Sequence, residues 1–333
     1  MTAFIKRREF ISLLGGAAAA WPLAARAQQA PVPVIGLLSS IAANGASFFL
    51  EPYRRGLKET GFVEGQNVKV EYRWADGHYD RLPALASELI SMRVSVITTM
   101  GDAAYAAKAA QSGRNNDVIP IVFALGDDPV ATGLVSSLNR PGAQITGATS
   151  FGHALGSKKL ELLHQLVPSA TTFAVLINPS QAGVMELKDI EQAARAVGLE
   201  TRVLHARSAS EIDEAFDVIR REQMNGLIIT VDTFLYTQSV RLGSLAALHS
   251  VPTIASLRAF AAAGGLISYN GSIRNVMLQQ GIYTGRILKG EKAADLPVQL
   301  PTKYDLTINL KSAHALGLEV PPGLSALADE VIE

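Results

Sequence analysis

The sequence has no cysteine and no charge bias, and these two absences exclude several classes of protein. Without a thiol, the chain can form no disulfide, no thiolate metal site and no cysteine-based redox centre. Thirty lysines and arginines balance thirty aspartates and glutamates, and beyond residue 27 no long run of basic residues is visible. Phosphate groups need a basic face, so we expect neither a nucleic-acid partner nor binding to a membrane surface through a polybasic patch.

Sequence motifs of common catalytic and cofactor sites are also missing. The chain contains no GxGxxG loop, no Walker A loop, no GxSxG elbow and no HExxH pair. Its six histidines are scattered at positions 78, 153, 164, 205, 249 and 314, and no two have helical spacing. We therefore expect no metal, no cofactor and no catalytic activity.

The long apolar runs of a membrane span are missing as well. The first apolar run, Ile11 to Leu23, has 13 residues, whereas a spanning helix needs about 20. Three basic residues at 6–8 precede this run, and the small residues Ala25 and Ala27 follow it. This order predicts a cleaved export signal over residues 1–27, and the Arg-Arg pair in "RREFISLLGG" is typical of the twin-arginine type. The alternatives are a buried first helix or an uncleaved anchor.

Cleavage of this signal would leave about 300 residues, enough for two domains. It would also remove four basic residues and one acid, so the mature chain stays close to neutral. We expect a protein that works in the periplasm of a two-membrane bacterium.

What the chain does have is a regular alternation of apolar strand patterns and amphipathic helical patterns. Examples are "VSVITTM", "IPIVFAL" and "TFAVLIN" for strands, and "DRLPALASELISM" and "EIDEAFDVIRREQ" for helices. A helix is also predicted for "DPVATGLVSSL", residues 128–138. Strands that each precede a helix indicate a parallel sheet covered on both faces, and the pattern restarts after residue 150.

We therefore predict an α/β protein with two doubly wound parallel-sheet lobes. Residues 31–150 plus 272–295 form the predicted N-lobe, and residues 151–271 plus 305–333 form the predicted C-lobe. The Pro-punctuated stretch "ADLPVQLPTKYDLTINL" is long for a loop inside either lobe, so we interpret it as a segment that crosses between them.

Parallel sheets bind ligands outside the carboxyl ends of their strands, so the residues that follow each predicted strand are candidate site residues. They are mostly hydroxyls, amides and carboxylates: Ser39, Ser40, Thr99 to Asp102, Gly126 to Asp128, Ser150, Asn178, Asp232, Thr233 and Ser268 to Asn270. Helices that begin nearby would direct free N–H groups toward a polar or anionic group of the ligand.

Two acidic positions are open to more than one interpretation. Asp128 stands before Pro129 and is well placed to cap the predicted helix, with ligand contact as a compatible second role. Asp232 follows a buried strand and is either a helix N-cap or the partner of a cationic ligand group. Phe234, Tyr236 and Tyr269 lie close to strand ends, where aromatic rings either line a pocket or pack in the core.

Four long segments together resemble the substrate-binding proteins of ABC transporters, whose better-understood branch binds tryptophan and related amino acids. They are "YRRGLKETGFVEGQNVKVEYRWADGHYDRLPALASELI", "IPIVFALGDDPVATGLVSSLNRPGAQITGATS", "AAGGLISYNGSI" and "GIYTGRILKGEKAADLPVQLPTKYDLTINLKSAHALGLEVPP". The resemblance covers nearly the whole mature chain. It implies a type I periplasmic-binding-protein fold, in which two lobes joined by a hinge of three crossing segments close around a ligand.

The resemblance also implies which positions contact the ligand, and we expect eight such residues: Ser39, Ser40, Gly101, Asp102, Asp128, Ser150, Asp232 and Tyr269. Gly101-Asp102 departs from the hydroxyl pair that members commonly carry there, and an ionised Asp102 would repel a ligand carboxylate. The segment "VDTFLYTQ" departs from the tryptophan-binding branch as well. The ligand of the tryptophan-binding branch therefore cannot be assumed for this chain, and a cationic or neutral polar compound becomes a better candidate.

These observations predict a periplasmic solute-binding component of an ABC importer. It would act as a monomer, capture a small polar or aromatic solute, possibly an amino acid or derivative, and dock on a permease in the inner membrane. A sensor that presents its ligand to a membrane receptor is the nearest alternative, and a periplasmic enzyme is a weaker one. A transcription regulator of the same fold would need an N-terminal helix-turn-helix where the export signal stands.

Overall fold

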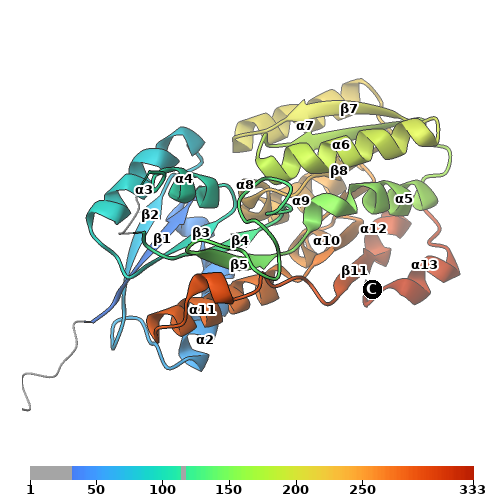
Figure 1. Ribbon diagram of the computed structural model, residues 1–333. Helices are drawn as coiled ribbons and strands as arrows, with labels where there is room; N and C mark the ends of the chain where they lie inside the picture. Colours follow the sequence, from blue (N-terminus) through green and yellow to red (C-terminus); the bar gives the residue numbers. More distant parts are fainter. Residues whose placement is uncertain (1–31, 114–117) are drawn as a thin grey trace, which may run out of the picture. The chain divides into compact units, whose positions relative to one another are not determined.

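Two β-sheets organise residues 32–113 and 118–333, the part of the chain that this computed structural model describes (Figure 1). The predicted export signal lies outside these residues. Val34–Glu333 forms one compact unit. Within the described ranges, we find no helix whose length and hydropathy would let it cross a membrane.

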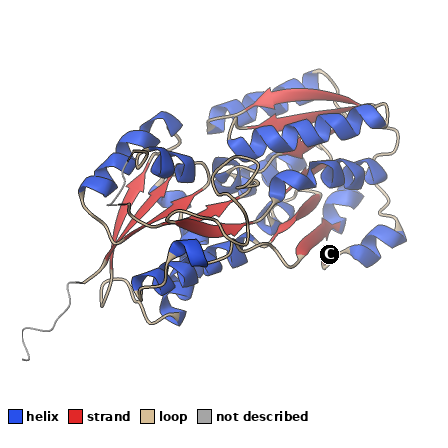
Figure 2. Cartoon of the chain, in the orientation of Figure 1, coloured by secondary structure: helices blue, strands red, loops and turns tan. Residues whose placement is uncertain are grey.

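The first sheet has five parallel strands in the order β2-β1-β3-β4-β5. Their bounds are Val34–Ser39 (β1), Lys69–Trp74 (β2), Val96–Met100 (β3), Ile121–Leu125 (β4) and Ile145–Thr149 (β5). The central strands are buried throughout, as expected for apolar runs covered on both faces. Figure 2 shows these strands as one group and those of the second sheet as another.

Helices cover both faces of the first sheet. On one face lie α3 (Leu82–Ser91) and α4 (Ala103–Ala109), and on the other lie α2 (Ser47–Glu59) and α11 (Ile273–Leu288) (Figure 1). Short 3-10 turns, η1 (Ala43–Gly45) and η2 (Tyr79–Arg81), follow the first two strands. The fourth covering helix therefore comes from a part of the sequence that follows most of the second sheet.

Helices α2 and α11 approach each other through a pair of glycines. A Cβ at Gly56 would lie 2.1 Å from the carbonyl oxygen of Leu278, and a Cβ at Gly281 would lie 2.1 Å from that of Tyr53. Real side chains do not approach backbone atoms so closely, so both positions require glycine. The contact buries Tyr53 and Met277 in the same apolar cluster.

The second sheet has seven strands in the order β12-β11-β10-β9-β8-β6-β7. Their bounds are Thr172–Ile177 (β6), Glu200–His205 (β7), Gly226–Ile229 (β8), Thr253–Ala255 (β9), Ile267–Gly271 (β10), Tyr304–Asn309 (β11) and Glu330–Ile332 (β12). All neighbours are parallel except β10 and β11, which are antiparallel.

Two apolar layers cover the second sheet. One contains α5 (Gly156–Leu166) and α6 (Gln181–Ala196), and the other contains α7 (Ala209–Arg221), α9 (Ser239–Leu248) and α10 (Arg258–Ala262). The remaining short elements are η3 (Gly152–Leu155), α8 (Thr233–Thr237), η4 (Ala293–Asp295), α12 (Leu310–Ala315) and α13 (Pro322–Leu327).

The chain passes between the two sheets three times. The first passage follows β5 at residues 150–151, the second follows β10 at Ser272, and the third is the extended stretch 296–303. The third passage pairs with the end of β5, where the backbone N–H of Thr149 donates to the carbonyl of Gln299 at 3.0 Å. This pairing ties the first and third passages together.

The predicted helix at residues 128–138 is wrong, because this stretch consists of turns and bends. The carboxylate of Asp128 accepts hydrogen bonds from the N–H groups of Val130 and Ala131, and the hydroxyls of Ser136 and Ser137 donate to the carbonyl of Arg140. These local side-chain bonds stabilise turns and compete with a helix.

Candidate functional site

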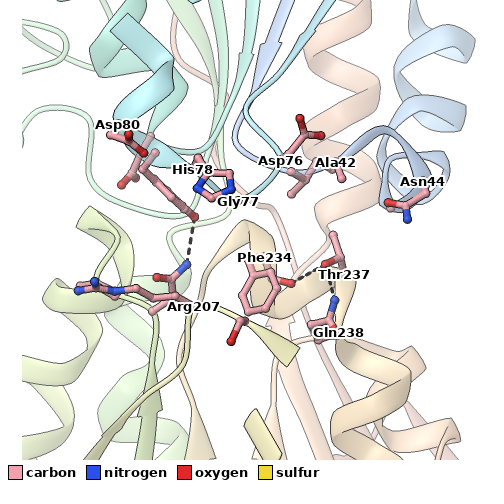
Figure 3. A pocket seen from close by; sticks show the side chains of 17 residues that line it. Ala42, Asn44, Asp76, Gly77, His78, Asp80, Arg207, Phe234, Thr237 and Gln238 are labelled. Atoms are coloured by element: carbon pink, nitrogen blue, oxygen red, sulfur yellow. Dashed lines mark hydrogen bonds between the residues drawn. The ribbon is translucent and has the colours of Figure 1, made fainter. Parts of the chain in front are cut away.

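A pocket of about 860 Å³ lies where the carboxyl ends of the strands of both sheets meet. Figure 3 shows His78 and Asp80 on the side of the first sheet, and Arg207 and Phe234 on the side of the second. The loops that follow β1, β2, β3, β6, β7 and β8 all contribute to its wall. The volume falls within the range of about 300–1,000 Å³ that is typical of small-molecule sites.

Asp232 links the two sides of this pocket. It follows β8 and caps α8, where one carboxylate oxygen accepts from the N–H of Leu235 at 3.0 Å and from the Asn178 amide at 3.1 Å. The other oxygen accepts from the hydroxyl of Tyr79 at 2.8 Å. Because Tyr79 lies in η2, beside the first sheet, this bond joins the two lobes directly. Both roles considered for Asp232 from the sequence, cap and site residue, are therefore compatible.

Asp102 forms the second direct link between the lobes. It stands at the start of α4, but its carboxylate accepts instead from the backbone N–H of Gln181, the first residue of α6, at 3.2 Å. The preceding Gly101 has φ +59°, and a Cβ there would lie 2.5 Å from the hydroxyl oxygen of Thr233. Glycine at this position allows the close approach of the loop after β8.

Asp127 is the third carboxylate of the site, and its side chain is 1% exposed. One oxygen accepts from the hydroxyl of Tyr105 at 2.5 Å, and the other, Oδ1, has no hydrogen-bond partner. Asp127 lines a second cavity of about 30 Å³ together with Asp102 and Asp232. This small cavity adjoins the large pocket, because Tyr79 and Asp102 line both.

The three carboxylates carry no compensating positive charge within hydrogen-bonding distance. Their donors are hydroxyls, an amide and backbone N–H groups, and the ion pairs of the described residues do not include them. Burial is the main cause that raises the pKa of Asp102 to about 7, and the charges of Asp232 and Asp127 add to it. Burial also raises the pKa of Asp127 and of Asp232.

A buried ion pair in the second lobe stabilises the end of β8, next to the site. Lys159 Nζ lies 2.7 Å from Glu186 Oε1, and both side chains are 0% exposed. The same ammonium donates to the Ser256 hydroxyl and to the Ile229 carbonyl, and the second oxygen of Glu186 accepts from the N–H of Val231. These bonds hold the backbone of Ile229 and Val231, just before Asp232, in position.

The structure brings three of the eight expected site residues together. Gly101, Asp102 and Asp232 line the small cavity. Ser39, Ser40 and Ser150 are buried at strand ends and line neither cavity.

Asp128 and Tyr269 also lie outside both cavities. Asp128 instead caps the turn that follows it, through bonds to Val130 and Ala131. Tyr269 packs on the core of the second lobe, with its ring centroid 6.1 Å from that of Tyr304. For both residues the structure gives a local role, as a turn cap and as a core aromatic.

Sequence reasoning overlooked two residues of the site, Tyr79 and Tyr105. Neither follows a strand directly, so the rule of strand ends does not select them. It did select Asp127, but the resemblance to the family put its neighbour Asp128 among the expected contact residues. Neighbouring residues point in different directions, and here Asp127 is the one that faces the small cavity.

Comparisons with known proteins place the chain in a family. The sequence profile of a family described as ABC transporter substrate binding protein matches residues 34–332. The chain belongs to this family. Its members are solute-binding proteins and not enzymes.

Among curated proteins, the chain is similar to a protein named tyrosine-binding protein from Clostridioides difficile strain R20291. The two are 23% identical over 266 residues, which is 80% of this chain and 75% of that protein.

Solved structures show the same fold. A conserved domain protein from Vibrio cholerae matches with a TM-score of 0.79, and an ABC domain in complex with L-Trp from Streptococcus pneumonia matches with 0.77. Both are 22% identical, and each alignment covers 90% of this chain and 99% of the other. More distant matches are described as periplasmic binding proteins. The fold is therefore that of the type I periplasmic binding proteins, with two lobes of parallel strands.

Proposed function

We propose that this protein is the periplasmic solute-binding component of an ABC importer. It captures a small polar or aromatic solute with an amino group in the 860 Å³ pocket and delivers it, as a monomer, to a permease of the inner membrane. The observation that carries the proposal is the pocket itself, which takes residues from the strand ends of both lobes in a chain of this family. The names of the tyrosine-binding relative and of the L-Trp complex support a solute with an amino group.

Closure would couple binding to transport. We propose that residues 31–150 with 272–295 move as one lobe, and residues 151–271 with 305–333 as the other. A ligand that touches both lobes favours the closed form by its extra affinity for that form. The Tyr79–Asp232 and Asp102–Gln181 bonds join the lobes in the same region, so ligand contacts there act directly on closure.

The contact residues that we propose are Asp232, Asp102, Asp127 and Tyr79, with Phe234 as an aromatic wall. Asp232 supplies a carboxylate from the second lobe, and Asp102 and Asp127 supply carboxylates from the first. An ammonium group between them would gain charge-assisted hydrogen bonds from both lobes at once.

A thermal-shift screen of the mature protein tests the binding step. The panel contains amino acids, amines, small carboxylates and sugars. A ligand at a hundred times its Kd adds about 2.7 kcal/mol to the free energy of unfolding, which is a readily measured rise in Tm. A protein that responds to none of these classes would contradict the proposed function.

Uptake tests the importer role. We expect deletion of the gene to lower uptake of the radiolabelled ligand, and re-expression of the full chain to restore it. Unchanged uptake with a lost transcriptional response to the ligand would favour a sensor. Cell fractionation with antibody to the protein checks the periplasmic location and the cleavage after Ala27.

A further inference from the structure

The residues that line the small cavity between the lobes indicate the chemical class of the solute more narrowly than membership of the family does. Three carboxylates line it, those of Asp102, Asp127 and Asp232, and they come from the ends of β3, β4 and β8. Asp127 and Asp232 are 1% and 4% exposed, and neither forms an ion pair within the described residues, although the charge of His153 acts on Asp127 from beyond hydrogen-bonding distance. Burying carboxylates without a counter-charge is costly, so this arrangement needs either bound protons or a cation supplied from outside.

Asp127 shows independently that the cavity is incomplete without a donor. Its Oδ1 is buried and has no hydrogen-bond partner, although its Oδ2 is bound to Tyr105. Buried acceptors in folded proteins almost always have a partner, so an unpaired one on a residue that lines a cavity indicates that a donor is expected there.

The size of the cavity suits one particular donor. At about 30 Å³ it holds a group the size of a water molecule, and an ammonium head has that size. Tyr79 and Asp102 line both this cavity and the 860 Å³ pocket, so the substituent of the amine can extend from one into the other. Phe234 in the larger pocket and Tyr236 in the smaller offer aromatic surface along that path.

The same carboxylates oppose an acidic group next to the nitrogen. In an α-amino acid, the carboxylate is two bonds from the amino nitrogen and would lie within a few ångströms of Asp102, Asp127 or Asp232. Like charges at such distances repel strongly in a partly desolvated site. Arg207, the arginine that lines the large pocket, is an exposed residue of that pocket and lines no part of the small cavity.

We infer that the solute is a protonated amine without a carboxylate beside its nitrogen, and that its ammonium head lies between Asp102, Asp127 and Asp232. The inference rests on the proposed function and narrows its ligand to one chemical class. Arylalkyl amines and short alkyl diamines both belong to this class.

Matched pairs of compounds test the inference by isothermal titration calorimetry at pH 7.5. The pairs are tryptamine with L-tryptophan, tyramine with L-tyrosine, and putrescine with L-ornithine, and each pair differs only in the carboxylate. We expect at least one amine to bind at least about tenfold more tightly than its amino acid, the size of a hydrogen bond to a charged group. If every amino acid binds as tightly as its amine, or more tightly, the inference is wrong while the proposed function stands.

Two isosteric variants locate the ammonium head. We expect Asp127→Asn to weaken amine binding about tenfold or more, and Asp102→Asn to reduce the preference for amine over amino acid by a similar factor. The control is Asp295→Asn, which removes the same charge from an exposed residue that lines neither cavity and should change Kd by less than about twofold. Equal effects of all three substitutions would show a general charge effect and overturn the proposed location.

A ligand of another class would separate the two hypotheses. If a sugar or a carboxylate raises Tm and the amines do not, the inference fails together with the proposed amino group of the solute, and the solute-binding role survives. If no class binds, both fail. Near-ultraviolet circular dichroism of each variant checks that the fold is retained.

Discussion

The molecule buries charge in two places, and the two places are built differently. Inside the second lobe, Lys159 and Glu186 neutralise each other, and bonds to Ser256, Ile229 and Val231 satisfy their remaining donors and acceptors. Between the lobes, Asp102, Asp127 and Asp232 are bonded to no cation within the described residues, and Oδ1 of Asp127 has no hydrogen-bond partner.

The difference separates a structural role from a binding role. The buried pair Lys159–Glu186 has all its hydrogen bonds within the protein, and it holds the backbone next to Asp232 without help from solvent or ligand. An unneutralised cluster is less stable by itself and becomes stable with protons or with a cationic ligand, which is the property that a site needs if binding is to drive closure. We therefore expect substitutions in the ion pair to change stability, and substitutions in the three carboxylates to change binding.

The largest effect is expected from breaking the satisfied pair. Lys159→Met leaves Glu186 buried and alone, and we expect it to lower the free energy of unfolding by about 3–5 kcal/mol in urea titrations. The double variant Lys159→Met/Glu186→Gln keeps an acceptor for Val231 and should recover most of that loss. Lys158→Met is the matched control, because its ion pair with Glu161 is exposed and should cost less than about 1 kcal/mol. A double variant as unstable as the single one would show that the pair's role is not electrostatic.

The next effect concerns the unneutralised cluster and appears in binding. Asp232→Asn keeps one oxygen that can cap α8, and its new amide N–H can donate to the Tyr79 hydroxyl, so the fold should lose less than about 1 kcal/mol. Binding of an amine should weaken by about 1.5–3 kcal/mol, because a charge-assisted bond is lost. Calorimetry and chemical denaturation measure the two quantities separately. If the variant loses folding stability but keeps its affinity for the amine, Asp232 acts only as the N-cap of α8.

The pH dependence of the ligand-free protein reports on the same three carboxylates. The folded pKa of Asp102, about 7, lies above its unfolded value near 3.9, so the folded state keeps a proton that the unfolded state releases between these values. Stability therefore falls as pH rises from about 4 to 7, by up to about 1.4 kcal/mol per pH unit, and levels off above 7. Asp127 and Asp232 shift in the same direction.

Other groups act on these carboxylates. Tyr79, Tyr105 and His153 lie within electrostatic range of them, and only His153 lowers the pKa of Asp127 by its charge. We expect Asp102→Asn to flatten the decline when wild type and variant are compared by urea titration at each pH. An identical decline in both would assign the dependence to other residues.

The smallest effect is expected from one of the bonds between the lobes, that of Tyr79 with Asp232. Tyr79→Phe removes the hydroxyl that donates to Asp232, and we expect a loss of about 0.5–1.5 kcal/mol of closure free energy. Small-angle scattering without ligand should show a more open average shape, and saturating ligand should restore the wild-type profile. A profile unchanged in both conditions would mean that this bond does not influence closure.

Much of the fold could be predicted from the sequence, because parallel strands and their helices have strong local periodicity. Strands such as "VSVITTM" and "TFAVLIN" and the helices between them formed as expected. The stretch 128–138 did not, because Asp128, Ser136 and Ser137 bind nearby backbone groups and hold turns. The strand β11 pairs antiparallel to β10 within a segment that we interpreted only as a crossing. The pairing of β11 depends on a tertiary contact, which cannot be predicted from the local sequence pattern.

The site was predictable only in part. Asp102 and Asp232 follow buried strands, so position alone selected them. Tyr79 contributes through a contact 153 residues away in sequence, and no local pattern indicates such a contact. The choice between Asp127 and Asp128 depended on which of two adjacent side chains faces inward, and a strand-end rule cannot resolve that.

The glycine contact between α2 and α11 has a consequence for synthesis. Translation proceeds from the N-terminus, yet one face of the first sheet is covered by residues 273–288. An emerging chain that ends near residue 150 already contains all five strands of that sheet and still exposes Tyr53 and its apolar neighbours. The first lobe therefore reaches its native state only when almost the entire polypeptide has left the ribosome, and a fragment of the N-terminal half is expected to aggregate.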